Sequence, residues 1–63
     1  MTSAADLLNR ARQKREEAIA LRRLAARLIA AADRETLLKE SVGLNAEAAA
    51  LETIAENMAS KKP

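Results

Sequence analysis

The stretch LIAAADRETLLKES, residues 28–41, decides the fold, because it is either the middle of one long helix or the turn between two. It contains neither glycine nor proline, so no residue in it forces the chain to change direction. The choice therefore rests on the apolar patterns that flank it.

Both flanking segments repeat their apolar residues every seven positions, as helices that pack along one seam do. The first repeat consists of Ala4, Ala11, Ala18, Ala25 and Ala32, with Leu7, Lys14, Leu21 and Leu28 three residues after the first four. The second repeat consists of Leu37, Ser41, Leu44, Ala48, Leu51, Ala55 and Met58. Each repeat alternates a small residue with a residue that is usually large.

The two repeats are out of phase by two residues, so the first cannot continue into the second on one helix face. A shift of two is not the insertion of three or four residues that interrupts long coiled coils. We therefore predict an all-α fold, an antiparallel two-helix hairpin with helices at about 4–31 and 34–59. Asp33 is the expected N-cap of the second helix.

Folding the chain at this turn pairs the two repeats in layers. The pairs are Ala32 with Leu37, Leu28 with Ser41, Ala25 with Leu44, Leu21 with Ala48, Ala18 with Leu51, Lys14 with Ala55 and Ala11 with Met58. Every layer sets a small residue against a larger one, which fills the space between close helices evenly. The same register places Ile29 beside Leu38 and Arg15 beside Glu52.

Lys14 is the one charged residue on the seam, and two interpretations of it stay open. Its aliphatic stem packs on the seam while its ammonium reaches out toward Glu52 or Glu56. Alternatively, a polar residue at this position specifies the alignment of the helices at a cost in stability.

The helix ends carry local signals. Ser3 followed by Asp6 predicts a capping-box start for the first helix. Gly43 is compatible with a continuous second helix or with a break after which Asn45 caps a third helix. The repeat passes through Gly43 undisturbed, so we expect one continuous helix. The chain is then a single domain, 1–63, with a frayed tail at 60–63.

The composition argues against catalysis. The 63 residues include no cysteine, histidine or aromatic residue, which removes thiol nucleophiles, the commonest general base and the commonest metal ligand. We expect no enzyme activity, no cofactor and no metal site. The longest apolar run is far shorter than the ~20 residues that span a bilayer. The expected protein is therefore cytoplasmic, with no membrane contact.

A lone hairpin of this size has too little core, so a second copy is expected to complete a four-helix bundle. Apolar residues beside the seam are the candidates for self-association. They are Leu8, Ile29 and Leu38 on one side of it and Leu24 and Ile54 on the other. The alternative is that these residues broaden the seam of a monomer.

Charge is divided unevenly between the two halves. Residues 1–32 carry seven basic and three acidic side chains, and residues 33–63 carry four and six. Five arginines of the first helix fall within an arc of roughly 140°. They are Arg12, Arg15, Arg22, Arg23 and Arg27. This candidate face could contact an acidic protein or a phosphate backbone, or it could be a solvated surface that aids solubility.

A short hairpin that begins with MT, has Ala/Leu layers and turns through a segment containing Asp resembles the Rop family of plasmid RNA-modulating proteins. The resemblance implies a dimeric four-helix bundle. It also implies binding to paired RNA hairpin loops through polar residues and an aromatic residue of the first helix. Here that helix is basic, and the chain has no aromatic residue. The pattern is also similar to that of short bacterial helical proteins without an assigned function.

Two functional hypotheses follow. The first is a self-associating hairpin that acts as a structural or protein-interaction module. The second is a nucleic-acid-binding regulator that uses the arginines of the first helix.

Overall fold

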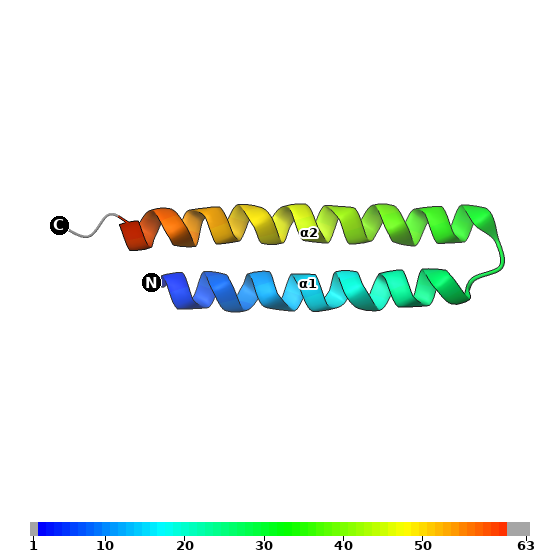
Figure 1. Ribbon diagram of the computed structural model, residues 1–63, viewed down its shortest axis with the longest axis horizontal. Coiled ribbons are helices and arrows are strands. Elements are labelled where there is room, and N and C mark those ends of the chain that lie inside the picture. The colour runs from blue at the N-terminus through cyan, green and yellow to red at the C-terminus, as the bar shows by residue number, and fades with distance from the viewer. Residues whose placement is uncertain (1, 61–63) are drawn as a thin grey trace.

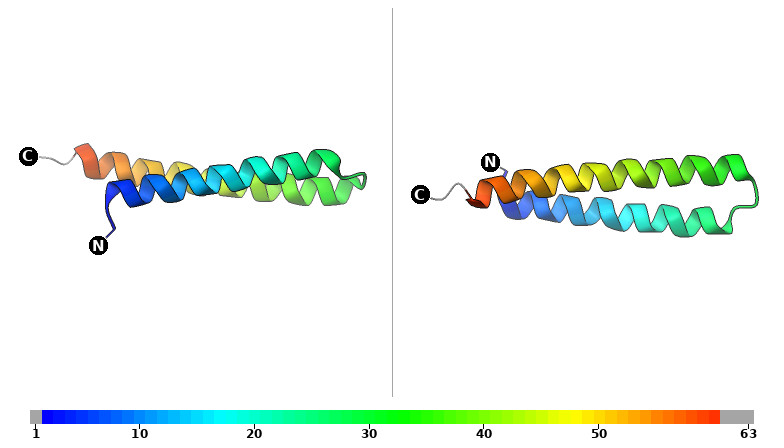
Figure 2. Two further views of the ribbon diagram at one scale, coloured as in Figure 1. Left: turned by 90° about the horizontal axis from the view of Figure 1, so that it is seen from below. Right: turned by 45° about the horizontal axis from the view of Figure 1, so that its top comes forward.

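The computed structural model describes residues 2–60 and shows two long antiparallel helices joined by a short loop. Helix α1 spans Ala4–Arg27 and helix α2 spans Ala31–Ser60. The molecule is a rod with extents of 54 × 15 × 13 Å (Figures 1 and 2). The predicted all-α hairpin is confirmed.

Helix α1 begins with the predicted capping box. The Ser3 hydroxyl oxygen accepts a hydrogen bond from the Asp6 N–H at 3.1 Å. In return, the Ser3 N–H donates to Asp6 Oδ2 at 3.2 Å. Two N–H groups at the start of the chain's first helix are thereby satisfied, and the acidic side chain lies favourably in the first turn.

The turn lies inside the expected stretch but earlier than predicted. Helix α1 ends at Arg27, four residues before the predicted end, and Leu28 is extended with ψ of 137°. The prediction that Asp33 is an N-cap is wrong, because α2 already begins at Ala31 and Asp33 lies in its first turn. A carboxylate in the first turn still interacts favourably with the helix dipole, so its presence did not locate the cap.

The seam of the hairpin is built from the small residues of both repeats. The buried residues are Leu7, Ala11, Ala18, Ala25, Ser41, Ala48 and Ala55. The larger residues three positions after each small one are only half-buried, except for Leu7, which is buried, and Met58, which is 41% exposed. Ala32 was predicted to lie on the seam, but it is exposed in the first turn of α2.

The helix ends exclude the predicted register. Four Cα–Cα steps join Arg27 to Ala31, so they lie at most about 15 Å apart. The predicted layers would put Arg27 opposite position 42 of α2, about 16 Å along the axis from Ala31. With helices ~8–10 Å apart, the loop cannot cover that separation.

Sliding α2 by one heptad resolves the conflict and keeps the same seam. Arg27 then lies opposite position 35, about 6 Å along the axis from Ala31. Figure 1 agrees, because the start of α1 lies beside the last turns of α2. The resulting layers are Ala25 with Leu37, Leu21 with Ser41, Ala18 with Leu44, Lys14 with Ala48, Ala11 with Leu51, Leu7 with Ala55 and Ala4 with Met58. Each still sets a small residue against a larger one.

Helix α2 is continuous through Gly43, as expected, and a Cβ at that position would meet nothing within 4 Å. Buried Ser41 donates its hydroxyl to the Leu38 carbonyl oxygen at 2.7 Å, so its polar group is satisfied within the helix. Ser60, predicted to fray, is the last residue of α2. The rest of the predicted frayed tail, 61–63, lies outside the described residues.

Candidate functional site

An apolar face without a partner runs along one side of the hairpin. At 3.6 residues per turn, the half-buried leucines lie about 60° around each helix from the buried small residues. We call them the leucine face, together with Met58: Leu21, Leu37, Leu44, Leu51 and Met58. Lys14 lies at the same helical position, three residues after buried Ala11. Their side chains fill only part of the seam, and the rest of their surface faces solvent on this side.

The exposed apolar residues beside the seam divide into two groups. Leu24 and Ile54 each precede a buried alanine, which puts them on the side of the leucine face, and they are 48% and 49% exposed. Leu8 and Leu38 lie on the opposite side and are 46% and 43% exposed.

Ile29 was predicted to pack beside Leu38, but this prediction is wrong. Ile29 lies in the loop and is 97% exposed. The early end of α1 removes it from the helix face on which the contact was predicted.

Lys14 forms the one charged layer of the seam within residues 2–60. Its Nζ lies 2.7 Å from Glu47 Oε2, and its side chain is 33% exposed. The predicted partners were Glu52 and Glu56. The shifted register explains the difference, because it sets Lys14 opposite Ala48, the neighbour of Glu47.

Arg15 and Glu52 form the predicted ion pair in a two-pronged geometry. Arg15 Nε donates to Glu52 Oε2 at 2.9 Å, and Arg15 Nη2 donates to Glu52 Oε1 at 2.6 Å. These hydrogen bonds hold the pKa of Glu52 below its ordinary value and raise that of Arg15. Arg15 is therefore occupied within the hairpin.

The other four arginines of the candidate face are exposed, three of them on the side opposite the leucine face and Arg27 on the outer side of α1, away from α2. They are Arg12, Arg22, Arg23 and Arg27, and we call them the arginine face. Within residues 2–60, none of them has a carboxylate oxygen within 4.0 Å, since the ion pairs there are those of Lys14 and Arg15. This face therefore presents guanidinium groups directly to solvent.

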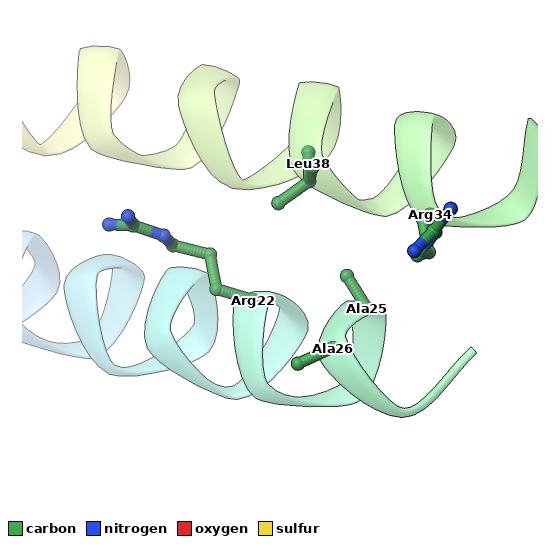
Figure 3. A pocket seen from close by; sticks show the side chains of 5 residues that line it. All are labelled: Arg22, Ala25, Ala26, Arg34 and Leu38. Carbon is green, nitrogen blue, oxygen red and sulfur yellow. The ribbon is translucent and has the colours of Figure 1, made fainter. Parts of the chain in front are cut away.

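A shallow hollow of about 330 Å³ lies at the edge of this face, near the loop. Its walls are Arg22, Ala25 and Ala26 of α1 and Arg34 and Leu38 of α2. Figure 3 shows Arg22 on one side of Leu38 and Arg34 on the other. Sequence reasoning did not include Arg34, because the predicted register placed it a heptad farther from Arg22 along the hairpin.

The described residues offer neither a metal site nor a membrane span. No group of three or more acidic, histidine or cysteine side chains among residues 2–60 is placed to hold a metal ion. Neither helix, over the same residues, is long and apolar enough to cross a bilayer. Residues 2–60 carry three surface features that could bind a partner: the arginine face, the hollow beside it and the leucine face.

These features define a class: an antiparallel α-helical hairpin with a close, small-residue seam and one apolar face without a partner. In comparisons with known proteins, no family model, no curated protein and no solved structure matches the chain.

Proposed function

We propose that this protein is a non-catalytic, self-associating helical module whose leucine face packs against a second copy to form a four-helix bundle. The observation that carries the proposal is the half-burial of the leucine face. Apart from Leu7, every buried residue of the hairpin is an alanine or Ser41. The side chains with the most apolar surface therefore lack a full set of contacts in one chain.

The exposed area supports the same proposal. The chain exposes 4936 Å², whereas a compact monomer of 6.8 kDa exposes about 4,000 Å². The excess, roughly 1,000 Å² per chain, resembles the ~800 Å² that each partner buries in a standard protein–protein interface. We expect a second copy on the leucine face to bury an area of that order.

The geometry of the seam favours a four-helix bundle over a monomer in which the leucines merely broaden the seam. The buried alanines point at the neighbouring helix, and the leucines point about 60° away from them. In a four-helix bundle each helix has a second neighbour at roughly a right angle to the first. The leucines then point to the centre between all four helices, where large side chains are needed.

Two pairs of substitutions at exposed apolar residues test this face. Leu24→Gln with Ile54→Gln alters the side of the leucine face, and Ile19→Gln with Val42→Gln alters the opposite side. The four residues are 48%, 49%, 50% and 67% exposed in the hairpin. Sedimentation should show a dissociation constant raised at least tenfold for the first pair and little change for the second. Equal effects would contradict the assignment of the face.

A second candidate function is binding of structured RNA through the arginine face, as the resemblance to Rop-type proteins implies. Four guanidinium groups without a carboxylate partner in the described chain favour it. Contacts would be mostly to phosphates, so affinity would fall steeply with salt. We expect Arg12→Gln, Arg22→Gln and Arg23→Gln together to abolish binding without changing the mass in sedimentation. No binding by the parent protein at ~50 mM salt would eliminate this function.

A further inference from the structure

We propose that the two copies associate with their loops at the same end of the bundle, each α1 lying between its own α2 and the α2 of the other copy. This arrangement rests on the proposed self-association and adds the orientation of the partner. Charge, helix direction and the apolar loop each favour it.

The two helices carry opposite net charge. Helix α1 has seven basic and three acidic side chains, a net charge of +4. Helix α2 has two basic and six acidic side chains, a net charge of −4. A neighbour of opposite charge is favourable over the whole length of a helix, whereas two α1 helices side by side would repel each other.

Only one two-fold arrangement makes every neighbouring pair both antiparallel and opposite in charge. With the loops at opposite ends and the leucine faces in contact, each α1 lies beside the like-charged α1 of the other copy, and each α2 beside the other α2. With the loops at the same end, α1 is antiparallel to both α2 helices, and the two α1 helices occupy one diagonal. This arrangement also opposes all the dipoles of neighbouring helices.

The loop supplies an independent argument for the same end. It consists of Leu28, Ile29 and Ala30, without a polar side chain, and Ile29 is 97% exposed. Three consecutive apolar residues form an exposed apolar tip, and contiguous exposed apolar surface is typical of contact sites. Two copies with their loops at one end bring the two apolar tips together, whereas the opposite arrangement separates them by the length of the molecule.

Spin labels on single cysteines test the arrangement, because the natural chain has no cysteine. Ile29→Cys places a label at the loop, and Ala59→Cys places one at the other end of the hairpin without altering the loop. Helix α2 has 30 residues, so opposite loops would be about 45 Å apart. Four helices of ~10–12 Å diameter keep labels at one end within roughly 30 Å of each other.

We expect both variants to give a dominant distance below about 30 Å between the two copies. A distance of about 40 Å or more for both variants would overturn the same-end arrangement while leaving self-association intact. No dipolar coupling at micromolar concentration, together with the sedimentation mass of a single chain, would overturn the proposed function and this arrangement with it. The two failures are therefore distinguishable.

Discussion

At the scale of single residues, Gly43 is a position at which a substitution can stabilise α2. It lies inside α2, and a Cβ there would meet no atom within 4 Å. We predict that Gly43→Ala stabilises the protein by about 1 kcal/mol, because glycine is the poorer helix former. Chemical denaturation at fixed protein concentration measures this. Ala46→Gly, at an exposed site of the same helix, should cost a similar amount. A loss of stability in Gly43→Ala would mean that another copy packs closely on this position.

The Arg15–Glu52 pair predicts a pH dependence. Hydrogen bonds from Arg15 hold the pKa of Glu52 below its ordinary value of 4.5. The pair therefore stabilises the fold above that value, and its contribution is lost as the pH falls through the lowered pKa. The stability difference between the parent and Glu52→Gln should shrink from pH 7 to pH 3.

The control for this titration is Glu56→Gln, because Glu56 is exposed and forms no ion pair within residues 2–60. Its stability difference from the parent should stay nearly constant over the same pH range. The role of Glu52 would be refuted by parallel pH profiles of the parent and Glu52→Gln.

The contact between Arg15 and Glu52 was predicted correctly from the sequence, although the register was not. The pair was predicted from a register that is wrong by one heptad, yet it forms. Side chains on a helix lean toward its N-terminus, so in an antiparallel hairpin Arg15 and Glu52 lean toward each other and cover the offset. For Lys14, the lean of the side chain does not compensate for the wrong register. Its partner Glu47 was therefore not predicted.

At the scale of the helices, the close approach of α1 and α2 depends on the small residues of the seam. Ala18 is 0% exposed, whereas Ala20 is on the outer surface. We predict that Ala18→Leu destabilises the protein by about 1–3 kcal/mol through overpacking, while Ala20→Leu changes its stability little. Thermal unfolding of both variants at one concentration measures the difference. Similar melting temperatures would show that the helices do not meet along this seam.

The seam could be predicted from the sequence, but its register and the end of α1 could not. The heptad repeats identify which residues face the other helix, and the structure confirms that set except near Ala32 and Met58. A slide of one heptad keeps the same seam and the same alternation of sizes, so packing alone does not choose between registers. The length of the loop decides the register. The sequence does not predict that length, because residues 28–32 are all apolar and equally compatible with a helix.

At the scale of the whole molecule, the two long faces of the rod have different chemistry. The leucine face is apolar apart from the Lys14–Glu47 ion pair, and the arginine face carries guanidinium groups that lack carboxylate partners in the described chain. A second copy on the leucine face would leave both arginine faces on the outside of the bundle. Self-association and the binding of an acidic partner are therefore compatible in one assembly.

The central claim is that the leucine face is covered by a second copy, and sedimentation equilibrium of the unaltered protein tests it most directly. We predict twice the chain mass of 6.8 kDa at micromolar concentration, with the mass falling toward one chain on dilution. A mass of one chain throughout, from a sample that remains folded and helical, would contradict the account.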